Sequence, residues 1–206
     1  METIPQIGYG TWNRPGDEAY RGTLTALEAG YRLLDCAESV GPGQVRPQVE
    51  ASLEKLGVGP VDLLLLHYPS INDEYEIVDY MAQFAAVFDA GLCRNIGMSN
   101  FTKTYIDQAL LLLGDRKLLT NQVELHVFLH NAPIVDHCTA KGIRMTAYSP
   151  LARGAVADDP VLARIGAEIG GTASQVALAW LLAKEHVVVP SAGAQPRIAE
   201  NFEAQN

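Results

Sequence analysis

The chain has 206 residues, 48% of them hydrophobic, which suffices for one domain with a sizeable core. Its formal net charge of −9 argues against a nucleic-acid partner and against binding to an anionic membrane. The three cysteines are widely spaced and form no CxxC pair, which favours reduced thiols over a disulfide framework. There is no basic leader and no apolar run of the roughly 18 residues that a membrane span needs. We therefore expect a soluble, cytoplasmic protein without a membrane partner.

Short apolar runs typical of strands alternate with amphipathic segments typical of helices along the whole chain. Gly30 and Gly57 mark the ends of the first two helices, and Thr172 with Gln175 forms a capping box. In chain order the pattern predicts strand 6–11, helix 18–29, strand 31–35, helix 44–56, strand 61–66, helix 77–90, strand 95–98, helix 102–113, strand 119–125, helix 132–140, strand 144–148, helices 159–169 and 173–185, strand 187–189 and helix 196–203.

The predicted strands are apolar throughout rather than alternating, which indicates a parallel sheet covered by helices. Such a sheet is either open and doubly wound or closed into a barrel. A doubly wound sheet concentrates its site at one switch point, whereas a barrel gathers every strand end into one ring. Polar residues follow the strands along the whole chain, at Asp35, His67, Ser99, Asn100, Gln122, Tyr148, Ser149 and Ser191. We therefore predict one α/β domain over residues 1–206, built as a (β/α)8 TIM barrel.

The pattern contains only seven strands, whereas this kind of barrel closes with eight and typically uses roughly 250 residues. The missing unit belongs between strands 31–35 and 61–66, and its absence would leave two sheet edges without partners. Either the block is truly deleted, or residues were omitted and the rest numbered straight through. The lack of any compensating strand favours omission, which predicts a break in the chain within residues 37–43.

Several of the strand-end side chains are suited to carbonyl chemistry. Asp35 either caps a turn or tunes a nearby proton donor. His67 follows four leucines, and its imidazole is either structural or orients or protonates a carbonyl oxygen near neutral pH. The hydroxyl and amides of Ser99, Asn100 and Gln122 can hold a carboxamide, because together they donate and accept hydrogen bonds.

Two further segments carry candidate ligands. His126 and His130 lie four residues apart, but VELHVFLH has the pattern of a strand and loop, so we expect no metal site. The segment VVVPSAGAQPRIAENF combines a strand, a loop of small residues and a helix start that carries Arg197. This pattern is typical of a phosphate site at a helix N-terminus, with an ordinary surface arginine as the alternative.

Taken in order, seven motifs resemble those of the aldo-keto reductase family: GYGTW, GYRLLDCAES, VDLLLLHYP, IGMSNF, NQVE, TAYSPL and VPSAGAQPRIAENF. Within the family the chain is most similar to the bacterial diketogluconate-reductase branch. The resemblance implies a (β/α)8 barrel that uses NADPH without a Rossmann domain. In this family a hydride passes to an aldehyde or ketone carbon while a tyrosine, tuned by a lysine and an aspartate, protonates the oxygen. A histidine orients the carbonyl.

Carried over by resemblance, Asp35 matches the family's aspartate and His67 its histidine. Val40 stands at the tyrosine position and cannot donate a proton. The Thr-Lys-aliphatic-Trp motif of the lysine does not occur in the sequence. Half of the catalytic set is therefore absent, together with the second helix and third strand.

The resemblance also implies a cofactor site for NADP(H), with NAD(H) possible because Ser191-Ala192 stands where the family often has Lys-Ser. Trp12 and Tyr68 would flank a small aldehyde or ketone substrate. The implied cofactor contacts are Thr11, Ser99, Asn100, Gln122, Tyr148, Ser149, Leu151, Ser191, Arg197, Glu200 and Asn201.

Two functions follow from the sequence. The first is NADP(H)-dependent reduction of small carbonyl compounds by a monomer. The second is a degenerate relative that binds the cofactor without turnover. A barrel of unrelated chemistry is a weaker third, which nicotinamide binding would exclude.

Overall fold

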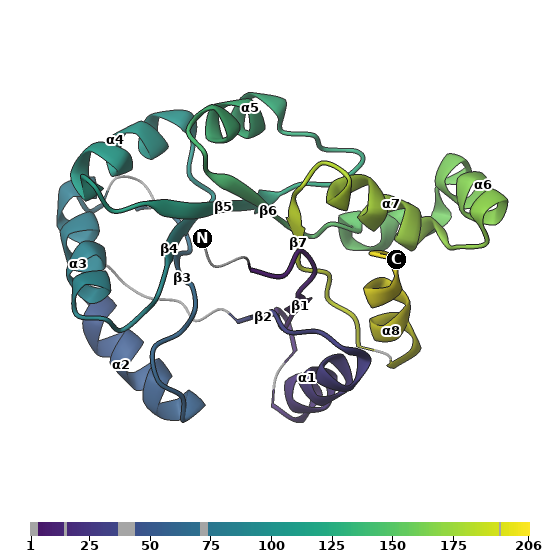
Figure 1. Ribbon diagram of the computed structural model, residues 1–206, viewed down its shortest axis with the longest axis horizontal. Coiled ribbons are helices and arrows are strands. Elements are labelled where there is room, and N and C mark those ends of the chain that lie inside the picture. Colours follow the sequence, from purple (N-terminus) through teal and green to yellow (C-terminus); the bar gives the residue numbers. More distant parts are fainter. Residues whose placement is uncertain (1–3, 15, 37–43, 71–73, 194) are drawn as a thin grey trace. The chain divides into compact units, whose positions relative to one another are not determined.

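The computed structural model describes residues 4–14, 16–36, 44–70, 74–193 and 195–206 (Figure 1). The chain divides into two compact units, each described by itself below. The terminal unit comprises residues Met1–Ala37, Glu124–Ala132 and Met145–Asn206, and the central unit comprises Glu38–Val123 and Pro133–Arg144. The prediction of a single domain is not tested by this division and stays a prediction. Within the described residues, no helix is long and apolar enough to cross a membrane.

The central unit is a parallel sheet bordered by helices. Strand β4 (Ile96–Ser99) pairs in parallel with β3 (Leu64–Leu66) and with β5 (Leu118–Glu124). Helices α2 (Val45–Leu56), α3 (Ile77–Asp89) and α4 (Lys103–Leu113) follow one another beside these strands, α3 packing against both neighbours (Figure 1). Helix α5 (Ala132–Ala140) follows β5. The core of the unit is apolar and includes Phe84, Ile96, Met98, Phe101, Ile106 and Leu113.

A bulge in β5 sets the register of the sheet. Ile96 pairs with Leu118, but Met98 pairs with Asn121, so β5 carries one more residue than β4 in this interval. Gly97 lies opposite the bulge, and a Cβ there would approach the Thr120 carbonyl oxygen to 2.8 Å. Only glycine therefore permits this strand spacing.

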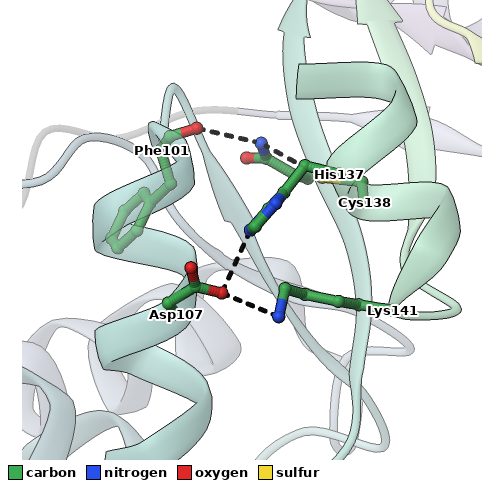
Figure 2. A network of polar contacts seen from close by, with 6 residues as sticks. Phe101, Asp107, His137, Cys138 and Lys141 are labelled. Atoms are coloured by element: carbon green, nitrogen blue, oxygen red, sulfur yellow. Dashed lines mark hydrogen bonds and ion pairs between the residues drawn. The ribbon is translucent and has the colours of Figure 1, made fainter. Parts of the chain in front are cut away.

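Within the central unit, polar contacts tie α4 to α5, and β5 to the segment after β4 (Figure 2). Asp107 on α4 faces His137 Nε2 at 3.0 Å and Lys141 Nζ at 2.7 Å, the latter just beyond α5. The hydrogen bond from Lys141 holds the pKa of Asp107 below its usual value. Beneath this surface network, the fully buried Asn121 donates to the Phe101 carbonyl oxygen at 3.1 Å. Burial also raises the pKa of the Cys138 thiol, which lies beside Asn121.

The terminal unit contains two short parallel strand pairs. β1 (Tyr9–Gly10) pairs with β2 (Leu34–Asp35), and β6 (Arg144–Tyr148) pairs with β7 (Val187–Val188). A parallel bridge from Ile7 to Val188 links the pairs. Its helical elements are α1 (Asp17–Ala29), the 3-10 helix η2 (Ala152–Asp158), α6 (Pro160–Ile169), α7 (Ala173–Leu182) and α8 (Gln195–Glu203).

Two buried tyrosines join the first strands to the C-terminal segment. The Tyr9 hydroxyl donates to the Ala192 carbonyl oxygen at 3.0 Å, and the Tyr31 hydroxyl donates to that of Ile198 at 3.1 Å. Helices α1 and α8 lie side by side (Figure 1). Burial raises the pKa of both phenols, so they remain neutral donors.

Most predicted elements are confirmed within two or three residues. The helix stops at Gly30 and Gly57 are left-handed, and the capping box of α7 is present. Strands β1, β2, β3 and β7 are shorter than predicted. Helix α7 ends at Leu182 rather than at residue 185, because Glu185 has a φ of 62°. The 3-10 helix η2 was not predicted.

The described part of the chain contains seven strands, as predicted. Val40, predicted to stand at the catalytic tyrosine position, lies outside the described residues, as does the predicted break within residues 37–43.

Replacing Gly22 by alanine is expected to destabilise the protein by about 1–3 kcal/mol, although alanine favours the helix by about 1 kcal/mol. The reason is that a Cβ at Gly22 would overlap the buried Tyr9 hydroxyl. Urea denaturation measures the change. In a Tyr9→Phe background the cost of Gly22→Ala should shrink, and an undiminished cost would contradict the assigned clash.

Stability is expected to fall as the pH is lowered from about 7 to 5.5. Burial, and then the charge of Lys184, lower the pKa of His186 in the folded protein. Below about pH 6.5 the unfolded chain therefore binds a proton that the folded chain does not, which costs up to about 1.4 kcal/mol per pH unit. Denaturation midpoints measured against pH should fall less steeply for His186→Gln. Parallel curves for the two proteins would contradict this.

Candidate active site

The carboxyl ends of β4 and β5 bring a hydroxyl and two amides together in the central unit. Ser99 and Gln122 are register partners, and both side chains are nearly buried. The Asn100 backbone N–H donates to the Gln122 carbonyl oxygen at 2.8 Å. These groups supply donors and acceptors at one place, which matches what a carboxamide requires.

Asn100 connects the ends of β3 and β4. Its backbone is left-handed, with a φ of 62°, a conformation that asparagine tolerates better than most residues. Its Nδ2 donates to the His67 carbonyl oxygen at 3.0 Å and lies 3.1 Å from the Ser99 hydroxyl oxygen. The turn at Asn100 therefore fixes the main chain where His67 leaves β3.

His67 and Tyr68 present stacked rings at the end of β3. Their ring centroids lie 4.9 Å apart with an interplanar angle of 29°. Both residues are exposed, and Tyr68 retains 54% of its accessible surface. An exposed imidazole with one face covered by an aromatic ring is accessible to a small ligand.

The terminal unit holds the other predicted catalytic residue. Both the backbone N–H and the hydroxyl of Thr11 donate to the Asp35 carbonyl oxygen at 3.0 Å. The Asp35 residue is half-buried at the end of β2, and the neighbouring Trp12 is 68% exposed. Thr11 therefore holds the ends of β1 and β2 together beside an exposed indole.

The end of β6 carries three of the predicted cofactor residues. Tyr148 and Ser149 are half-buried, and Ser149 turns the chain with a φ of 47°. The Ser149 carbonyl oxygen accepts a hydrogen bond from Ala152 N at 2.8 Å, which begins η2. Leu151 packs on an apolar cluster that includes Val156.

The loop after β7 and helix α8 carry the remaining predicted cofactor residues. Ser191 and Arg197 are exposed, whereas Asn201 is buried. Glu200 Oε1 accepts a hydrogen bond from the Thr172 hydroxyl at 2.6 Å, which joins α8 to the capping residue of α7. An exposed guanidinium in the first turn of α8 fits a phosphate group.

One residue that the sequence reasoning missed is Arg14. Its Nε lies 3.4 Å from the Ser191 hydroxyl oxygen, and its guanidinium forms an ion pair with Glu18. The only signal in the sequence was its position two residues after the GYGTW motif.

The histidines at 126 and 130 lie in a non-helical turn, as predicted, with backbone hydrogen bonds between His126 and Leu129. His126 Nε2 lies 3.4 Å from Glu124 Oε1. His130 instead packs against Trp180 with ring centroids 4.9 Å apart. Among the described residues, no three metal-ligating side chains cluster.

Comparison with known proteins decides the family. The family model described as the aldo/keto reductase family matches residues 38–206. The chain belongs to this family. Methylglyoxal reductase DkgB of Escherichia coli O157:H7 is 33% identical over 234 residues, which cover 98% of this aldo/keto reductase and 88% of the relative. An aldo-keto reductase of Mycolicibacterium smegmatis is 31% identical and covers 98% and 84%.

Solved structures agree with the family. A putative 2,5-diketo-D-gluconic acid reductase B has a TM-score of 0.91 at 32% identity, covering 98% of this aldo/keto reductase and 82% of that chain. Aldose reductase from Schistosoma japonicum has a TM-score of 0.88 at 28% identity, covering 98% and 84%. The predicted fold class, an α/β barrel of the aldo-keto reductase type, is confirmed by these matches, and the protein is an oxidoreductase of this family.

The span matched by the Escherichia coli relative is longer than this aldo/keto reductase. Because 234 positions exceed 206 residues, at least 28 residues of the relative within that span have no counterpart here. A number of this size corresponds to about one strand and one helix.

Asn100→Ala is expected to destabilise the protein by about 1–3 kcal/mol, because it removes the bond to His67 and leaves a left-handed alanine. Asn100→Gly removes the same bond without the strain, so its cost should be smaller. Urea denaturation gives the order. An alanine variant more stable than the glycine variant would contradict the role of backbone strain.

Proposed function

We propose that the protein reduces the aldehyde or ketone group of small molecules with NADP(H). The observation that carries this proposal is the convergence of Ser99, Asn100 and Gln122 at the ends of β4 and β5, with His67 bonded to the same turn. This arrangement matches a nicotinamide carboxamide with a carbonyl-orienting imidazole beside it. Membership of the aldo/keto reductase family supports the same chemistry.

Each unit has its own part in the proposal. In the central unit, Ser99, Asn100 and Gln122 hold the carboxamide, and Tyr68 flanks the substrate. In the terminal unit, Tyr148 stacks on the nicotinamide, Ser149 and Leu151 contact the pyrophosphate region, and Trp12 flanks the substrate. The adenosine end of the cofactor is held by Arg197, Glu200 and Asn201, and Thr11 and Ser191 are further cofactor contacts. The bound cofactor supplies the hydride.

The proton for the carbonyl oxygen needs a donor within this chain. The position of the family tyrosine is occupied by Val40, which has no transferable proton. His67 is the residue that we propose in its place, because an exposed imidazole donates near neutral pH and is reprotonated from solvent. In the terminal unit, the Asp35 carboxylate at the end of β2 is the second proposed catalytic residue.

The substrate class is proposed from the relatives. Several are named methylglyoxal reductase, and others aldose reductase. Both names refer to a small, polar compound with a carbonyl group. An exposed indole and phenol, at Trp12 and Tyr68, are suited to packing on such a compound.

A second candidate function is cofactor binding without turnover. It rests on Val40 and on the absence of the Thr-Lys-aliphatic-Trp motif from the sequence. Without a proton donor of matched pKa, hydride transfer to a carbonyl would be slow.

Protein shown by intact mass to contain only these 206 residues should oxidise NADPH in the presence of methylglyoxal or glyceraldehyde. His67→Ala should lower kcat by about 10²-fold or more, the usual contribution of a general acid. Lys117→Ala, an exposed change outside the proposed site, should have no effect. NADPH binding without turnover would favour the second function, and the absence of any nicotinamide binding would overturn both.

A further inference from the structure

The loop after β7 lacks a cation of its own where the family often has one. Ser191 and Ala192 occupy the positions of the family's Lys-Ser, and the next described residue is Gly193. A phosphate bound at this loop would lose one positive partner. With a net charge of −9 for the whole chain, the general field of the protein does not replace it.

Arg14 reaches this loop from the other end of the chain. Its Nε lies 3.4 Å from the Ser191 hydroxyl oxygen. A Cβ at Gly193 would lie 2.5 Å from Arg14 Nη1 and 3.2 Å from Cζ. The guanidinium therefore rests directly on the backbone of Gly193, in space that any side chain there would occupy.

Contacts on several sides hold this guanidinium in place. The loop main chain is held by Tyr9, whose hydroxyl donates to Ala192, and by Gly10, whose N–H donates to Pro190 at 3.0 Å. Glu18 in the first turn of α1 pairs with Nη1 of Arg14. The Arg14 side chain is 24% exposed, so the held guanidinium still meets solvent.

A hollow opens beside these residues, between α1 and the start of α8. Glu18, Gly193 and Gln195 are among its lining residues, and Asp17 and Arg21, which pair with each other, also border it. Because Asp17 and Glu18 place negative charge beside the hollow, an anion bound there needs a directed, positively charged hydrogen-bond donor. Arginine meets this need, because its five N–H groups form a rigid fork and the described contacts use only Nε and Nη1.

We propose that Arg14 supplies the cation for the 2′-phosphate of NADP(H) that the 191–193 loop lacks, and so sets the preference for NADP(H) over NAD(H). This inference rests on the proposed function. Arg197 in the first turn of α8 is the second cation of the same subsite. Arg14 is thus a specificity-determining residue, not one that acts on the carbonyl.

Calorimetric titration with 2′,5′-ADP, 5′-AMP and ADP tests the proposal without any catalytic step. Arg14→Ala should weaken 2′,5′-ADP binding about 10- to 100-fold, the usual loss for a charge-assisted hydrogen bond. Binding of 5′-AMP should change by less than about threefold, because it lacks the 2′-phosphate. Arg14→Gln, which keeps the length of the side chain, should behave as Arg14→Ala does if the charge is what matters.

Arg21→Ala is the matched control. Arg21 lines the same hollow and lies 3.8 Å from Asp17, and it makes no described contact with residues 191–193. Its removal should leave 2′,5′-ADP binding unchanged. Adding Ser191→Lys to Arg14→Ala should restore much of the lost affinity, because it returns a cation to the loop.

Three results would overturn the inference: unchanged 2′,5′-ADP binding in Arg14→Ala, an equal loss in Arg14→Ala and Arg21→Ala, or an equal loss for ADP and 2′,5′-ADP. The last would assign Arg14 to the 5′-phosphate, which both nucleotides carry, instead of the 2′-phosphate. If the wild-type protein binds NADPH and reduces a carbonyl compound in any of these cases, the proposed function still holds. Wild-type protein that binds no nicotinamide cofactor removes the proposed function itself.

Discussion

The left-handed turn at Asn100 is the constraint on which the central unit's site depends. At this one residue the chain leaves β4, its backbone N–H donates to the Gln122 carbonyl oxygen on β5, and its side chain donates to the His67 carbonyl oxygen just after β3. Three strand ends are thus related through a single residue. A residue that could not adopt a φ of 62° would lose the turn, and a residue without an amide would lose the bond to β3.

In the terminal unit, hydroxyl groups rather than an amide connect segments that are distant in the sequence. Its strands are only two to five residues long, so ladder hydrogen bonds alone hold little of it together. The buried phenols of Tyr9 and Tyr31 instead reach the main chain of the C-terminal segment. Because burial keeps both phenols protonated, these bonds persist across the physiological pH range. The same contacts position the loop against which Arg14 rests.

Sequence reasoning succeeded where a local signal had a local cause. The capping box at Thr172 and the glycine stops at Gly30 and Gly57 depend on a few neighbouring atoms, so they could be read directly. Arg14 was missed because its partner Ser191 is 177 residues away, and no periodicity links the two. The hydrogen bond from the Thr172 hydroxyl to Glu200 was missed for the same reason, since it depends on how α7 and α8 pack. The roles of Asp35 and His67 in catalysis remain predictions.

The extra residue in β5 has a consequence for which amide stands opposite Ser99. Without the bulge, the register of β4 and β5 would place Ser99 opposite Asn121. The bulge moves Gln122 into that place and turns Asn121 inward, where it bonds to Phe101. The two neighbouring amides thereby differ in position: that of Asn121 is part of the buried structure, whereas that of Gln122 lies at the strand ends. A single-residue deletion in this strand would exchange them while leaving every polar side chain of the loops intact.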